Sequence, residues 1–177
     1  MSCMPKLSTS VLIVGGVIIF AGITILAKYD VLVLRISVPQ EQGDLVYQDF
    51  ASSGTKLCMQ YIHSVERTPV QGWFALSSDG GFQALRTMSK GSGTGLPNVV
   101  DKPRVTMAHG WMVVDEGRTH VPQIPFYYLP LNDLRISVSG QKVDLSKVSS
   151  GSKLLITNEK MSLAKAMLRF AFDESPQ

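Results

Sequence analysis

The sequence lacks charge over one long stretch near its start. Between Lys6 and Lys28 the run LSTSVLIVGGVIIFAGITILA holds no acidic or basic side chain. About twenty apolar residues let a helix cross roughly 30 Å of hydrocarbon, so the run predicts a transmembrane helix. A cleavable signal peptide is the alternative, because ILA before Lys28 resembles a small-residue cleavage site. The apolar part of a signal peptide is usually about 7 to 15 residues long, so length favours an anchor.

Small residues in this run indicate how the helix would pack. One side of the helix would carry small residues, Gly15, Gly16 and Gly22, and a second transmembrane helix could approach that side closely. Lys6 stands against Lys28 across the membrane, so charge does not decide the orientation. A first apolar segment behind a very short polar stretch most simply leaves the long remainder outside the cytoplasm. We therefore expect a single-pass protein of the bacterial inner membrane, in contact with lipid, with its C-terminal domain in the periplasm.

Cysteine and clustered positive charge are also scarce. The chain has two cysteines, Cys3 and Cys58, which would lie on opposite sides of the membrane and so form no disulfide. The net charge of +3 is spread along the chain, without the run of Lys or Arg that binds nucleic acid. We expect no nucleic-acid partner.

Histidine is too rare and too dispersed to indicate a metal site. The three histidines are His63, His109 and His120, and two of them with Glu66 could in principle hold zinc. Their spacing is not that of a zinc helix, and no CxxC pair accompanies them. We expect His109 in a turn, His120 exposed, and neither a metal nor another cofactor.

What the chain does contain is a series of short β-branched and aromatic runs from Tyr29 onward, separated by turn residues. This pattern predicts a mainly β protein, with an antiparallel sandwich or barrel-like domain over 29–158, after an anchor over 1–28. Turns are expected at 79–81, 109–110 and around Gly140. The pentapeptide LRISV occurs at 34–38 and again at 134–138, and predicts two strands with Leu, Ile and Val facing inward.

The last part of the chain, 159–177, has a different composition. The sequence NEKMSLAKAMLRFAFDESPQ contains helix formers with apolar residues at helical spacings, so we expect a C-terminal helix and a loose end. Its apolar face is broad enough to need a partner. The domain's own sheet, the membrane surface and another subunit remain open as that partner.

Two polar segments are candidates for chemistry. In YIHSVERTPV, Ser64 and His63 would face opposite sides of an extended strand, which disfavours a nucleophile and base pair. The segment fits better as a polar corner in which Ser64 or Thr68 bonds local backbone and Pro69 fixes the exit. In GSGTGLP, alternating glycines indicate unusual backbone angles or close approach to another chain, and only weakly an anion cradle.

A third segment, VPQIPFYYLPLND, sets aromatic residues among prolines. Such residues are usually half core and half surface, and aromatic side chains are favoured anchors at interfaces. Core packing is the expected role of the segment as a whole. Tyr127 and Tyr128 are nevertheless candidates for an interface.

Together, YIHSVERTPV and GSGTGLP resemble an uncharacterised family of small bacterial proteins, over roughly Val31 to Asp144. The family's motifs are a strand ending in HSVE-x-TPV and a glycine-rich loop ending in GxGLP. They fall here on His63, Ser64, Val65, Glu66, Thr68, Pro69 and Val70, and on Gly93, Gly95, Leu96 and Pro97. An acidic residue often follows TPV in the family, where this chain has Gln71 and Gly72.

The resemblance implies a membrane-anchored protein whose gene lies beside a tripartite ATP-independent periplasmic (TRAP) transporter of the TAXI type. It implies no enzymatic activity. The expectation is therefore a non-catalytic accessory subunit that binds the transporter's membrane subunit, with the solute-binding protein as a further candidate partner. An anchored periplasmic ligand-binding domain or enzyme using His63 and Glu66 is the alternative. A general envelope protein without a link to transport is a third possibility.

Overall fold

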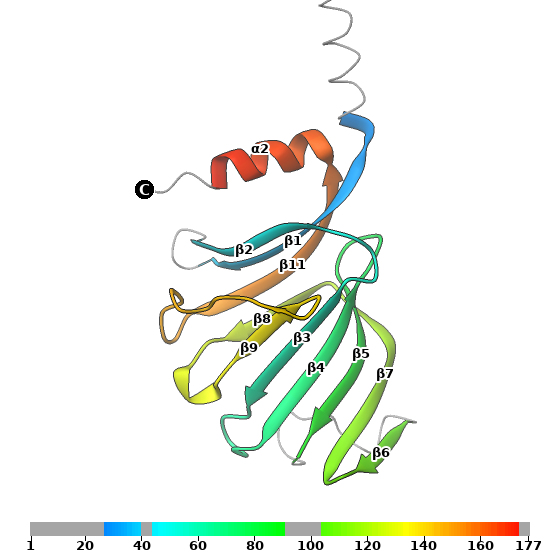
Figure 1. The fold of residues 1–177 in the computed structure, drawn as a ribbon, viewed down its shortest axis with the longest axis vertical. Coiled ribbons are helices and arrows are strands. Elements are labelled where there is room, and N and C mark those ends of the chain that lie inside the picture. Colours follow the sequence, from blue (N-terminus) through cyan, green and yellow to red (C-terminus); the bar gives the residue numbers. More distant parts are fainter. Residues whose placement is uncertain (1–26, 40–43, 91–103, 174–177) are drawn as a thin grey trace, which may run out of the picture. The chain divides into compact units, whose positions relative to one another are not determined.

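Two antiparallel β-sheets make up most of the structure (Figure 1). The computed structural model describes residues 27–39, 44–90 and 104–173. The four-stranded sheet has the order β2-β1-β11-β8, and the seven-stranded sheet has the order β10-β9-β3-β4-β5-β7-β6. The prediction of a mainly β, antiparallel fold is confirmed. Within the described residues no helix is long and apolar enough to cross a membrane, and the predicted transmembrane run before Ala27 lies outside them.

The described residues contain eleven strands, and the shortest, β10, lies at an edge of the seven-stranded sheet. The four-stranded sheet contains β1 (Asp30–Val38), β2 (Asp44–Ala51), β8 (Gln123–Tyr127) and β11 (Lys153–Ser162). The seven-stranded sheet contains β3 (Lys56–Ile62), β4 (Pro69–Leu76), β5 (Phe82–Ser89), β6 (Val105–Ala108), β7 (Trp111–Val121), β9 (Arg135–Val138) and β10 (Gln141–Lys142). A short 3-10 helix, η2 (Pro130–Asn132), precedes β9, and the helix α2 (Leu163–Asp173) follows β11.

The chain divides into two compact units. Among the described residues, 27–31 and 161–173 belong to the first, and those within 32–160 belong to the second. The second unit holds the seven-stranded sheet and most of the four-stranded one. The first unit holds the start of β1, the end of β11 and α2.

The turn predictions are confirmed at each hairpin. Gly80 and Gly81 connect β4 to β5 with φ angles of 93° and 67°, which glycine adopts at little cost. His109 and Gly110 connect β6 to β7, and His109 itself has a φ of 51°. Gly140 connects β9 to β10 with a φ of 83°. The seven-stranded sheet therefore grows by short turns between neighbouring strands over most of its width.

Both copies of LRISV face their apolar side chains inward, as predicted. In the first copy Leu34, Ile36 and Val38 are at most 1% exposed. In the second copy Leu134, Ile136 and Val138 are 7%, 1% and 8% exposed. The Arg and Ser between them are more exposed in each case. One copy lies in each sheet, and the apolar residues of both belong to the same core cluster. The shared pentapeptide therefore reflects a common strand pattern and not an internal duplication.

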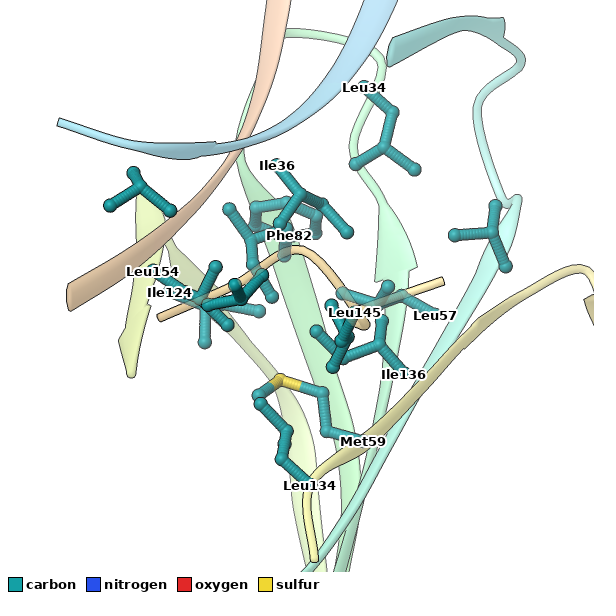
Figure 2. Close-up of a cluster of buried hydrophobic side chains, with 14 of the residues drawn as sticks. Leu34, Ile36, Leu57, Met59, Phe82, Ile124, Leu134, Ile136, Leu145 and Leu154 are labelled. Carbon is teal, nitrogen blue, oxygen red and sulfur yellow. The ribbon is translucent and has the colours of Figure 1, made fainter. Parts of the chain in front are cut away.

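A single cluster of buried apolar side chains joins the two sheets (Figure 2). Its largest fully buried member is Phe82, whose ring meets Phe74 edge to face with centroids 6.5 Å apart. The four-stranded sheet contributes Leu34, Ile36, Val38, Ile124, Leu154 and Ile156, and the seven-stranded sheet contributes Leu57, Met59, Leu76, Phe82, Ile136 and Val138. Burial of this surface is the main force that holds the second unit together.

The tip of the β4–β5 hairpin is fastened to the other sheet by Asn158 of β11. The Asn158 side-chain amide donates to the carbonyl oxygens of Ser77 at 3.1 Å and Gly81 at 2.7 Å. The Gly81 N–H donates to the Asn158 carbonyl oxygen at 2.7 Å. Asn158 is 3% exposed, so these bonds satisfy polar groups that water cannot reach.

The aromatic segment after β7 is divided between core and surface, as expected. Phe126 and Tyr128 pack against the core cluster, whereas Tyr127 is 60% exposed. Pro125 is tolerated within β8 because β8 is the edge strand of its sheet. The segment is a strand and a turn of 3-10 helix, with the Phe126 ring meeting Tyr61 at a centroid distance of 5.0 Å.

The C-terminal helix is shorter than the predicted segment and begins later. The prediction placed the change of structure at 159, whereas β11 continues to Ser162 and α2 begins at Leu163. Alternating burial continues along β11 as far as Met161, which is 6% exposed. The Ser162 hydroxyl oxygen then accepts from the Lys165 N–H at 3.4 Å, which caps the first turn of α2.

Candidate functional site

The HSVERT segment forms the turn between β3 and β4. The His63 N–H donates to the Thr68 carbonyl oxygen at 2.8 Å, and the Arg67 N–H donates to the His63 carbonyl oxygen at 2.9 Å. Arg67 adopts a φ of 55°, which closes the turn. Pro69 is the first residue of β4, where the strand needs no donor from it. The interpretation of this segment as a polar corner at the end of a strand agrees with this geometry.

The His63 ring takes part in the turn. Its Nδ1 atom accepts from the Glu66 N–H at 3.2 Å. Ser64, Val65 and Glu66 are exposed, with Val65 72% accessible. The Thr68 hydroxyl is buried and has no hydrogen-bond partner among the described residues, so the turn uses the Thr68 backbone and not its side chain. The motif thus brings together a histidine ring and a backbone N–H, and not a histidine and a carboxylate.

This geometry predicts different effects for two substitutions of His63. His63→Ala removes the acceptor for the Glu66 N–H and is expected to lower the free energy of unfolding by about 0.5 to 1.5 kcal/mol. His63→Asn should keep most of the stability that His63 contributes, because the short Asn side-chain carbonyl can accept the same hydrogen bond in a turn. Urea unfolding in mild detergent measures both. Equal losses for the two variants would show that the Nδ1 contact does not stabilise the turn.

A shallow hollow lies beside the turn. The ends of β3 and β4 line it with Gln60, Tyr61 and Gln71, and Asp133 and Arg135 complete the rim. Arg135 pairs with Asp133 at 2.7 Å, but both side chains are more than half exposed, which makes the pair weak. The volume of about 150 Å³ is below the roughly 300 Å³ at which small-molecule sites begin. The hollow is too open and small to enclose a substrate.

The outer face of the seven-stranded sheet carries two aromatic rings, each covered by a cation. The Arg86 guanidinium lies 4.2 Å from the centroid of Trp73, its cross-strand neighbour. The Lys90 ammonium lies 5.2 Å from the centroid of Trp111. Both rings are only partly buried, while both cations are exposed. We call this set, with Met88 and Val113 between the two pairs, the aromatic–cation face.

The surroundings of this face are polar. Leu57 and Met59 point into the core, so Cys58 and Gln60 point to the outer face, beside Ser137 and Arg135 of β9. On the other flank Arg104 pairs with Asp115 at 3.4 Å. Aromatic residues and arginine at the centre of a half-buried patch are the composition that protein interfaces favour. The arrangement therefore has the composition of a surface that can bind another protein.

Residues 57–145, half of the chain, match the profile of a family described as a domain of unknown function, DUF1850. The chain belongs to this family. Neither the curated proteins nor the solved structures yield a match. The match begins at Leu57, later than the start at Val31 that the motifs suggested, and ends beside Asp144 as they did.

The DUF1850 match coincides with one sheet. It runs from β3 to just beyond β10 and so takes in the seven-stranded sheet almost completely, together with β8. β1, β2, β11 and α2 fall outside it. The HSVERTPV turn and the aromatic–cation face therefore both belong to the DUF1850 part of the chain.

The pKa of Cys58, on this face of the DUF1850 part, argues against a reactive thiol. Burial raises the pKa of the Cys58 thiol, and this outweighs the opposing effects of Gln60 and Arg86. A thiol attacks as its thiolate, so a raised pKa makes Cys58 a poor nucleophile near neutral pH. The Asp115 carboxyl has a lowered pKa, first because the Gly117 N–H donates to it and then because of Arg104.

The remaining predicted residues have mixed outcomes. His109 lies in a turn and His120 is exposed, as expected. No group of three or more His, Cys, Asp or Glu side chains within the described ranges could hold a metal ion. Gly93, Gly95, Leu96 and Pro97 of the second motif lie outside the described residues, as do Gly15, Gly16 and Gly22 of the apolar run and Cys3.

The aromatic–cation face was not found from the sequence. Trp73 and Arg86 are separated by a hairpin, and their pairing depends on a register shift between Trp73 and Phe74. The available signal was the position of Trp73, two residues after Gln71 on the polar side of its strand. Tyr127, which the sequence did single out, is exposed in β8 of the other sheet.

Proposed function

We propose that this protein is a non-catalytic accessory subunit of a TAXI-type TRAP transporter, anchored in the inner membrane by the apolar run before Lys28. Its β-domain, a sandwich of two sheets in this proposal, lies in the periplasm and binds the transporter's membrane subunit. Support from the sequence is the resemblance carried by the HSVE-x-TPV and GxGLP motifs. It implies a genetic link to such transporters and no enzymatic activity.

The aromatic–cation face is the observation that carries this proposal. Trp73 and Trp111 are large apolar groups on an outer sheet face, and Arg86 and Lys90 place positive charge directly over them. Aromatic and arginine side chains supply most of the hot spots of known protein interfaces. The cations of the face suit a partner surface rich in carboxylates, because opposite charge favours encounter and correct orientation.

The first experiment is a tagged pull-down of the full chain from native membranes in mild detergent. We expect a large multi-spanning transporter subunit to be recovered in near-equal amount. Trp73→Ala and Arg86→Glu are expected to reduce that recovery about tenfold or more, as loss of an interface hot spot does. The matched control is Phe50→Ala, which removes a 46% exposed aromatic ring from β2 in the other sheet.

Other outcomes would contradict parts of the proposal. Equal recovery with Trp73→Ala and the Phe50→Ala control would place the interface elsewhere, and loss with Tyr127→Ala alone would place it on β8. Failure of the native chain to recover any transporter subunit would overturn the accessory role. The favoured function would then be an anchored ligand-binding domain or enzyme that uses His63 and Glu66. A ligand screen on the native chain and on His63→Asn would test it.

A further inference from the structure

The helix α2, drawn orange to red in Figure 1, carries apolar side chains on its exposed side. Leu168 and Phe172 are 61% and 76% exposed and lie one turn apart on the same side of the helix. Ala164 stands one turn before Leu168 in the same row, and Met167 beside it is 53% exposed. Ala166, in contrast, is completely buried. The helix thus has one apolar side within the protein and a second facing outward.

The charge of this helix is positive up to its last residue, Asp173. From Met161 to Phe172 the sequence contains Lys165 and Arg169 and no acidic residue, and Lys160 comes directly before. Lys165 is exposed next to the row formed by Ala164, Leu168 and Phe172. A helix with exposed apolar residues flanked by lysine and arginine is typical of a segment that lies in the interface of an anionic membrane.

The start of α2 lies beside residues that follow the expected membrane span in the sequence. The Leu163 N–H, at the start of the helix, donates to the Tyr29 carbonyl oxygen at 2.7 Å. Tyr29 is one residue beyond Lys28, where the apolar run has ended, and it is 63% exposed. Tyrosine is enriched at the boundary between membrane and water. An 11-residue helix is about 16 Å long, so every residue of α2 lies within about that distance of its start beside Tyr29.

We propose that α2 is a membrane-surface helix, whose row of Ala164, Leu168 and Phe172 enters the lipid interface of the bilayer that holds the apolar run. Lys165 then lies at the level of the lipid phosphates. The proposal rests on the anchor of the proposed function, but it does not depend on any transporter. It assigns a role to the exposed apolar side chains of this row.

Depth-dependent fluorescence quenching tests this placement in the full chain. Cys3 and Cys58 are replaced by serine, and one cysteine is introduced by Leu168→Cys or Phe172→Cys and labelled with bimane. The matched control is Asp79→Cys, at the exposed tip of the β4–β5 hairpin. The protein is placed in vesicles of phosphatidylethanolamine and phosphatidylglycerol containing nitroxide-labelled lipid. We expect severalfold stronger quenching at positions 168 and 172 than at 79, and the reverse order with aqueous iodide.

Each other outcome is decisive. A label at 168 that iodide reaches as easily as at 79 would overturn the membrane-surface helix, provided that the chain resists carbonate extraction, and the anchor would stand. Release of the chain by carbonate would overturn the anchor and the helix together. A label shielded from both quenchers would mean that protein covers α2. Equal lipid quenching in neutral phosphatidylcholine vesicles would remove the role given to Lys165 while keeping the apolar contact.

Discussion

Phe82→Ala is expected to lower the free energy of unfolding by about 3 to 5 kcal/mol, as large-to-small changes of a buried aromatic residue do. Phe82 is 0% exposed and lies in the cluster that joins both sheets, where its ring meets Phe74. The surrounding strands can close only part of the cavity that its loss would leave. Because small domains are stable by only about 5 to 15 kcal/mol, this single change should remove a large fraction of that margin.

Urea unfolding followed by tryptophan fluorescence measures this loss, because Trp73 and Trp111 both lie in the seven-stranded sheet. Tyr127→Ala is the control, since its ring is 60% exposed and its loss should change stability by no more than about 0.5 kcal/mol. A loss below about 1 kcal/mol for Phe82→Ala, against the usual range for such sites, would mean that the two sheets do not close over one core.

Gly81→Ala is expected to be nearly as damaging, although it adds a single methyl group. The φ of Gly81 is 67°, a conformation that costs a residue with a side chain about 1 to 2 kcal/mol. A Cβ at this position would also lie 2.8 Å from the Val121 carbonyl oxygen and 3.1 Å from Pro122 Cα. Moving that backbone should cost a further 1 to 3 kcal/mol or so, the usual cost of overpacking.

Gly54→Ala separates the two contributions. Gly54 has a φ of 84°, and a Cβ there would meet nothing within 4 Å, so only the conformational cost applies. Thermal or urea unfolding of both variants should show a clearly larger loss for Gly81→Ala. Equal losses would mean that the hairpin tip is not held tightly against Val121 and that the Asn158 bonds contribute little to its position.

The strands of this protein were predictable where local chemistry decides them. The glycines at 80 and 81, the pair at 109 and 110, and the inward Leu, Ile and Val of both LRISV copies needed only turn geometry and alternation. The HSVERT corner was likewise predictable, because a polar segment that ends at a proline favours a turn over a continued strand. Each of these features depends on residues within a few positions of one another.

Other features depend on pairing over long sequence separations, and the sequence did not reveal them. Gln60 of β3 lies opposite Arg135 of β9, so the second LRISV strand joins the sheet between β10 and β3, and not beside β8, the strand that precedes it in the chain. Trp73 reaches Arg86 only through a register shift. The helix was placed too early because helix formers at 159–162 read as helix, while tertiary pairing keeps them in β11.

The order of the strands has a consequence for how the chain folds as it is made. The strands of the seven-stranded sheet lie between Lys56 and Lys142, interrupted only by β8, but the four-stranded sheet needs β1 near the beginning and β11 near the end. Leu154 and Ile156 of β11 belong to the core cluster that both sheets share, so this core stays incomplete until the last strand has been made. The apolar side chains of this cluster would therefore be accessible to chaperones and proteases while the chain is being made.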